Sequence, residues 1–191
     1  LFTGIQPTGQ IHLGNYIGAY KNSVGLQDEY QSFFSIVDLH ALTINYQAQD
    51  YQNTILETAI TLLAFGIDPK KSILFVQSWV PEHTELMWIL NTLTPMGEMQ
   101  RMTQYKEKAD EQSDNVNVGL FDYPVLMTAD ILLYKGQLVP VGDDQVQHVE
   151  TARFLVRRIH QRDGKTFPEP KPRLTKSSRI MSLTKKKKKM S

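Results

Sequence analysis

One carboxylate, on an otherwise apolar helix, has a type and position that could do chemistry. The segment YPVLMTADILLY (123–134) carries a single charge, and helical spacing places Tyr123, Met127 and Asp130 on one face. A buried carboxylate is costly unless it accepts a hydrogen bond. The donor could be an internal side chain or the N–H of a bound ligand. Indole, with one donor and no acceptor, would suit a lone carboxylate in an apolar pocket.

A glycine-rich turn follows the first apolar segment, with the sequence GIQPTGQIHLGNYIGA (4–19). Glycines allow close approach of backbone or ligand, and His12 and Asn15 fall near a helix N-terminus, where free N–H groups favour an anion. Neither GxGxxG nor GxxxxGK[ST] occurs, which argues against a standard dinucleotide or P-loop site. The alternative is an ordinary turn with a capping Asn15 and a surface His12.

Two acids join a short apolar segment to a helix in VPVGDDQ (139–145). Asp143 and Asp144 could be helix caps, or they could accept hydrogen bonds from ribose hydroxyls. His148, three residues further on, is expected to be an exposed helix residue rather than a catalyst.

Lysines dominate the end of the sequence, RIMSLTKKKKKMS (179–191). Such a run is usually solvated or makes loose contact with a polyanion. Lys108 could likewise reach a triphosphate or be an exposed helical lysine.

These segments follow the order found in class I aminoacyl-tRNA synthetases, and the sequence resembles the tryptophanyl-tRNA synthetases over nearly its whole length. HLGN (12–15) is similar to the HIGH signature, and KMS (189–191) to the start of KMSKS. GIQPTG, TADILLY and VPVGDDQ favour the tryptophanyl over the tyrosyl enzymes. The sequence departs from the family at 185–187, where the family usually has Asp-Pro and a small residue, and this leaves the role of these lysines open.

The resemblance implies two substrate sites and two catalytic residues. His12 and Lys189 would act on the phosphates, Asp130 would accept from the indole nitrogen, and Mg²⁺ would arrive with ATP, with no metal site in the protein itself. The residues implied for ATP are Gln6, Pro7, Thr8, Gly14, Asn15, Gly142, Asp143, Asp144, Ile180, Lys189, Met190 and Ser191. Those implied for tryptophan are Asp130, Phe2, Gln6, His40, Tyr123, Met127, Val139, Val141 and Gln145.

The reaction implied is tryptophan–tRNA ligation. The tryptophan carboxylate would attack the α-phosphorus of ATP to give tryptophanyl-adenylate and pyrophosphate, and tRNA(Trp) would then take the acyl group. A carboxylate nucleophile is ionised at neutral pH, so catalysis needs positioning and electrostatic stabilisation rather than a general base. The alternatives are a tyrosyl-tRNA synthetase, another HxGH nucleotidyltransferase, and a non-enzymatic paralogue that binds RNA or protein.

Apolar runs that alternate with helix-period segments position these residues and indicate an α/β fold with a parallel sheet. The resemblance implies a Rossmann-like doubly wound sheet with a helical insertion. We expect strands at 2–5, 32–37, 72–77 and 139–141. We expect helices at 13–24, at 54–65 ended by Gly66, at 122–134 capped by Asp122 with Pro124 in the first turn, and from Asp143 or Asp144 to Asp163-Gly164.

One catalytic domain is expected over 1–191, with a helical insertion at about 81–120 that would form a homodimer interface. The chain begins at Leu1 and ends mid-motif, so we expect a fragment that lacks the family's C-terminal helical tRNA-binding domain. A polar exposed loop is expected at 109–118, and the segment after Thr166 is rich in proline and lysine.

Composition limits the other possibilities. The formal charge is +1, from 21 basic and 20 acidic residues, which argues against a surface devoted to nucleic acid. The absence of cysteine excludes disulfides and thiolate chemistry. No apolar run approaches a membrane span, and no signal peptide is visible. We expect no membrane partner and a cytoplasmic location, with an organelle as the alternative.

Overall fold

The computed structural model of the chain describes residues 1–8, 16, 20–103 and 116–174. Predictions for most of the glycine-rich turn, for the segment 104–115 and for the lysine-rich end lie outside these residues.

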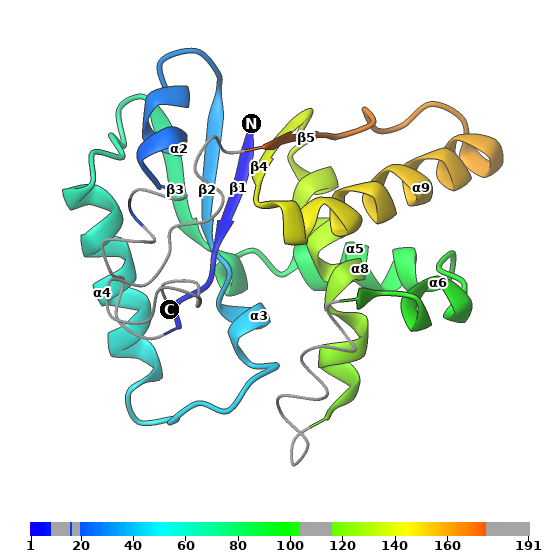
Figure 1. The fold of residues 1–191 in the computed structure, drawn as a ribbon, viewed down its shortest axis with the longest axis horizontal. Helices are drawn as coiled ribbons and strands as arrows, with labels where there is room; N and C mark the ends of the chain where they lie inside the picture. Colours follow the sequence, from blue (N-terminus) through cyan, green and yellow to red (C-terminus); the bar gives the residue numbers. More distant parts are fainter. Residues whose placement is uncertain (9–15, 17–19, 104–115, 175–191) are drawn as a thin grey trace, which may run out of the picture.

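Parallel strands form the centre of the molecule (Figure 1). Strands β1 (Phe2–Ile5), β2 (Ser32–Ile36) and β3 (Ser72–Val76) pair in the order β1-β2-β3, with Phe2 opposite Phe33. A second parallel pair, β4 (Leu138–Val141) and β5 (Lys171–Leu174), lies with β4 beside β1. The four strands expected from apolar runs are confirmed to within a residue at each end.

Strand β5 was not predicted, because its sequence KPRL is short, polar and contains a proline. Pro172 lies opposite Val139 and has no N–H to donate. A proline is tolerated on an edge strand, and β5 has one strand neighbour within the described part of the chain.

Helices cover both faces of the sheet because successive side chains on each strand point to opposite sides. On one face, Phe34 and Ile36 pack against α2 (Lys21–Leu26) and α4 (Tyr51–Ala64). On the other face, Phe2 and its neighbours pack against α8 (Val118–Leu133) and α9 (Val146–Asp163). This arrangement confirms the doubly wound α/β fold.

Helix α8 begins four residues before its predicted start. Its N-cap is Asn117, whose side chain accepts from the Leu120 N–H at 2.9 Å. The prediction that Asp122 caps the helix was wrong, because Asp122 lies in the second turn and accepts from the Asn91 amide at 2.7 Å. Pro124 was also misplaced, since it lies inside the helix rather than in its first turn.

The other helices lie close to their predicted positions. Helix α4 starts three residues earlier than expected and is followed by Gly66, whose φ of 104° few other residues adopt. Helix α9 follows the 3-10 turn η3 (Asp143–Gln145) and ends at Gly164, with φ 83°. Of the helix predicted at 13–24, the structure describes the end, where α2 lies.

Between β3 and α8 the described chain is largely helical, and its assignment as an insertion stays a prediction. It contains η2 (Gln77–Trp79), α5 (Glu82–Asn91) and α6 (Met96–Gln100), and Leu90 packs into a core shared with α8 and α9. Trp79 and Trp88 are 77% and 73% exposed on this segment. The dimer interface expected here stays a prediction. None of the described helices is long and apolar enough to cross a membrane.

Candidate functional site

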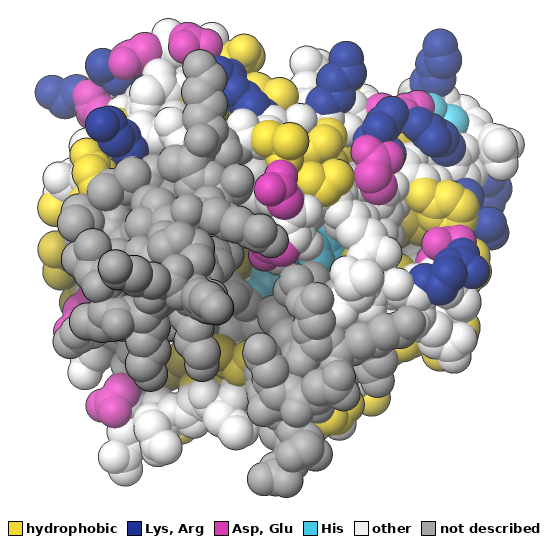
Figure 2. Space-filling view, in the orientation of Figure 1, with side chains coloured by type: hydrophobic (Ala, Val, Ile, Leu, Met, Phe, Trp, Pro, Cys, Tyr) yellow, Lys and Arg dark blue, Asp and Glu magenta, His cyan; other side chains and the backbone are white. Residues whose placement is uncertain are grey.

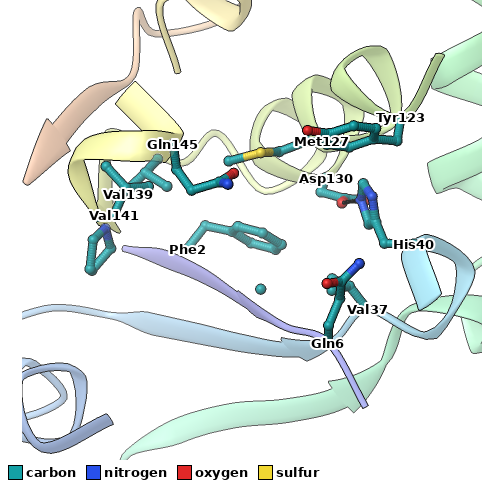
Figure 3. A pocket seen from close by; sticks show the side chains of 13 residues that line it. Phe2, Gln6, Val37, His40, Tyr123, Met127, Asp130, Val139, Val141 and Gln145 are labelled. Atoms are coloured by element: carbon teal, nitrogen blue, oxygen red, sulfur yellow. Dashed lines mark hydrogen bonds and ion pairs between the residues drawn. The ribbon is translucent and has the colours of Figure 1, made fainter. Parts of the chain in front are cut away.

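A cavity of about 260 Å³ lies beside the carboxyl end of β1, between β4, α8 and the short helix α3 (Asp38–Ala41) (Figure 3). Figure 2 shows a histidine in a hollow near the middle of the molecule, with acidic side chains beside it. All nine residues predicted for tryptophan line this cavity, together with Gly4, Val37, Pro140 and Gly142.

The cavity wall is mostly apolar and carries a few polar side chains. Phe2, Val139 and Val141 form one side, and Met127 lies across from Phe2 (Figure 3). The side-chain amides of Gln6 and Gln145 face the space between them. A flat apolar group with a few polar ends would fit such a lining.

Asp130 lies at the polar end of the cavity and is 1% exposed. Its Oδ1 accepts from Gln77 Nε2 at 2.7 Å and from His83 Nδ1 at 2.6 Å, and its Oδ2 accepts from His40 Nε2 at 2.8 Å. The sequence left open an internal donor or a ligand donor. The structure provides three internal donors while keeping Asp130 on the cavity wall.

The pKa of Asp130 lies below its ordinary value. Burial by itself would raise this pKa. The hydrogen bonds from His40 and His83, together with the charge of those rings, lower the pKa by more than burial raises it. The side chain is therefore an ionised, acceptor-only group near neutral pH.

Two of these donors, Gln77 and His83, were not predicted. They come from η2 and α5, about fifty residues before Asp130 in the sequence. The available signal was physical, because a carboxylate on an apolar helix requires donors from some other element. Gln77 could have been a candidate, since it directly follows a buried strand at the carboxyl edge of the sheet.

The third donor, His40, is held in place by two hydrogen bonds between α3 and η2. The Ser78 N–H donates to Asp38 Oδ1 at 2.9 Å, and the Leu39 N–H donates to Gln77 Oε1 at 3.1 Å. These bonds fix the start of α3, and with it His40, against the end of β3.

Tyr123 is held from the opposite direction by α9. Its hydroxyl lies 2.7 Å from His148 Nε2, and the His148 side chain is 0% exposed. The prediction that His148 is an exposed helix residue was therefore wrong. Helical spacing places it on the same face as the buried residues Ala152 and Leu155, so the periodicity of α9 carried the correct signal.

The residues predicted for ATP are described in part. Gln6 and Gly142 line the cavity, Pro7 is buried and Thr8 is exposed just beyond β1. A Cβ added at position 142 would lie 2.6 Å from Asp144 Oδ1, so the exposed Asp144 side chain would have to move to admit it.

Asp143 and Asp144 are exposed at the start of η3, beside the cavity residues Gly142 and Gln145. Neither is an N-cap residue, because the N-caps of η3 and α9 are Gly142 and Gln145. Both carboxylates are exposed at the cavity rim, and Asp144 Oδ2 accepts from Gln145 Nε2 at 3.3 Å.

The remaining predicted residues lie outside the described part of the chain. They are His12, Gly14, Asn15, Lys108, Ile180, Lys189, Met190 and Ser191. Among the described residues, no group of three or more His, Asp or Glu side chains could hold a metal ion.

Comparison with known proteins gives a consistent result. The family model described as class I tRNA synthetases for tryptophan and tyrosine (W and Y) matches residues 1–191. A tryptophan–tRNA ligase from Caldanaerobacter subterraneus subsp. tengcongensis is 52% identical over all of this chain and 58% of its own length. One from Clostridium tetani is 50% identical over all of this chain and 57% of its own length. The chain thus spans somewhat more than half the length of these relatives.

Solved structures show the same likeness. A tryptophanyl-tRNA synthetase from Campylobacter jejuni, complexed with ADP and tryptophan, has a TM-score of 0.93 and 42% identity, covering all of this chain and 59% of that one. The enzyme from Mycoplasma pneumoniae has a TM-score of 0.90 and 41% identity, covering all of this chain and 56% of that one.

Proposed function

The chain belongs to the class I tRNA synthetases for tryptophan and tyrosine, and on that premise we propose that it is the catalytic region of a tryptophan–tRNA ligase. The observation that carries the choice of tryptophan is the ionised Asp130 on the wall of an apolar cavity. A carboxylate has about four acceptor sites, and three donors occupy three of them. One N–H of a ligand can therefore be accepted, and indole has one to give.

The cavity also supports the orientation of the substrate. With the indole against Phe2 and Met127, the amino acid end would lie near polar groups of Tyr123 and Gln145. Gln6 and Gly142 line the cavity and are also predicted to contact ATP. The substrate carboxylate would therefore lie next to the nucleotide at these two residues.

Activation would join the tryptophan carboxylate to the α-phosphorus of ATP and release pyrophosphate. The exposed Asp143 and Asp144 suit the ribose hydroxyls, and His12 and Lys189 would stabilise the phosphates, with Mg²⁺ carried by ATP. The terminal hydroxyl of tRNA(Trp) would then take the acyl group and release AMP.

Pyrophosphate exchange tests this proposal. The full-length protein should exchange labelled pyrophosphate into ATP when tryptophan is present, and tyrosine should not replace tryptophan. Exchange driven by tyrosine would identify the tyrosyl activity instead. Absence of exchange with either amino acid would favour a binding paralogue.

A homodimer is part of the proposal. The exposed Trp79 and Trp88 lie with Ile89 and Met96, also exposed, on the helical segment after β3. Large apolar side chains gathered on one segment are typical of an interface. Sedimentation of the full-length protein should give twice the monomer mass, and Trp88→Glu should reduce it to the monomer. A cytoplasmic location, where tRNA is charged in bacteria, completes the proposal.

A further inference from the structure

His83 is fully buried, lies outside the cavity lining, and makes a hydrogen bond at each ring nitrogen. Its Nδ1 bonds Asp130 Oδ1 at 2.6 Å, and its Nε2 lies 2.8 Å from the Tyr134 hydroxyl. A histidine bonded at both nitrogens has its orientation and its proton position determined by its partners.

Asp130 and Tyr134, the two partners of His83, indicate which groups in this row carry protons. The ionised Asp130 has no proton, so His83 Nδ1 is the donor. Burial, followed by the negative charges of Asp130 and Glu82, raises the pKa of Tyr134 to about 12, so its hydroxyl keeps its proton. Tyr134, His83 and Asp130 thus form a continuous row of hydrogen bonds, in which His83 Nδ1 donates to Asp130.

Tyr134 is itself anchored on the sheet. Its ring stacks on Phe33 at 4.9 Å and on Phe2 at 5.8 Å, and it packs against Phe75 at 5.2 Å. The His83 ring also stacks on Phe75, at 5.9 Å. Aromatic contacts with β1, β2 and β3 therefore hold the chain of hydrogen bonds in place.

The two oxygens of Asp130 are used unequally. Oδ1 accepts from both Gln77 and His83, which fills its two lone-pair sites. Oδ2 accepts from His40, a residue of the cavity wall, and keeps one site open. A ligand N–H in the cavity can be accepted at Oδ2 and not at Oδ1.

We infer that His83 is a positioning residue for substrate selection. Together with Gln77 it occupies Oδ1 and so holds Asp130 with Oδ2 toward the cavity. The inference rests on the proposed function, because the N–H accepted at Oδ2 is that of the indole ring.

The test compares two substrates in the pyrophosphate exchange assay on the full-length protein. One is tryptophan, and the other is the analogue in which sulfur replaces the indole N–H. His83→Leu should raise KM for tryptophan about tenfold or more, the cost of a misaligned charged hydrogen bond. The analogue donates nothing to Oδ2, so its KM should change less than about threefold, as should KM for ATP.

Two amide variants separate positioning from packing. In His83→Asn the amide nitrogen replaces Nδ1 and can still donate to Asp130, whereas in His83→Gln it replaces Nε2. The asparagine variant should recover most of the preference for tryptophan over the analogue, and the glutamine variant should not. His160→Leu is the matched control, because His160 bonds the Phe167 carbonyl at the far end of α9.

The results divide clearly. If the folded His83→Leu variant shows the same rise in KM for tryptophan and for the analogue, or no rise for either, the inference is overturned. If that variant does not fold, equal preference in the asparagine and glutamine variants overturns it. Failure of the unaltered protein to use tryptophan would instead refute the proposed function.

Discussion

Replacing Asp130 with asparagine puts one NH₂ group where a carboxylate now meets three donors. Placing the amide oxygen at the Oδ1 position keeps both Gln77 and His83 paired. The NH₂ then faces His40, which can accept it by changing tautomer. This orientation leaves no donor in conflict, so the variant should adopt it, and it presents an N–H to the cavity where Oδ2 was.

The cost to tryptophan follows from that exchange. Losing the charged acceptor removes about 1.5–3 kcal/mol, and leaving the indole N–H unpaired adds about 1–3 kcal/mol. The value of kcat/KM for tryptophan should fall roughly 10²-fold or more, while KM for ATP stays nearly unchanged. Three charge-assisted hydrogen bonds become neutral ones, so stability should fall by about 2–4 kcal/mol.

In Asp130→Asn, pyrophosphate exchange with tryptophan and with the sulfur analogue measures the change in kcat/KM. Urea unfolding measures the change in stability. The preference for tryptophan over the analogue should disappear. A variant that keeps kcat/KM for tryptophan within threefold would refute the reasoning, because Asp130 would then accept nothing from the substrate.

Other predictions concern stability and the opposite wall of the cavity. His148→Leu removes a partner of the Tyr123 hydroxyl and should raise KM for tryptophan about threefold to tenfold in the exchange assay, and an unchanged KM would contradict that role. Gly66→Ala forces a side chain into φ 104° and should lower the free energy of unfolding by about 1–2 kcal/mol in urea. Asn117→Ala removes the cap of α8 and should cost about 1 kcal/mol in the same measurement. Because the pKa of Asp130 is lowered, its stabilisation is complete above about pH 4 and is lost as the pH falls through the lower folded value, so the stability gap between wild type and Asp130→Asn should narrow below pH 4.

The sequence predicts the parts of the fold that are determined locally. Continuous apolar runs predict β1 to β4, and the glycine stops of α4 and α9 are correct. β5 is stabilised by pairing with β4 rather than by its own residues, so its sequence gave no sign of it. The start of α8 was misjudged because the polar residues at 109–118 were assigned to a loop, whereas Asn117 caps the helix and Asp122 accepts from Asn91.

For the site, the sequence identifies residues of the cavity wall but not the residues that hold Asp130 in place. Helical spacing places three of the nine wall residues, Tyr123, Met127 and Asp130, on one face, and the other six came from the family resemblance. Gln77 and His83 contact Asp130 rather than the cavity, and no local spacing reports a contact between elements about fifty residues apart. His148 was misassigned from its nearness to a motif, although its position on α9 indicated burial.

The order of the hydrogen-bonding residues along the chain has a consequence for protein synthesis. The donors at positions 40, 77 and 83 are all made before their acceptor at position 130, and the cavity wall is complete only at residue 145. At roughly 5–20 residues per second, the ribosome takes several seconds to pass from α5 to α8. During that interval none of the three donors has Asp130 as its acceptor. We expect the nascent chain through α5 to stay loosely packed around these side chains until α8 supplies the carboxylate.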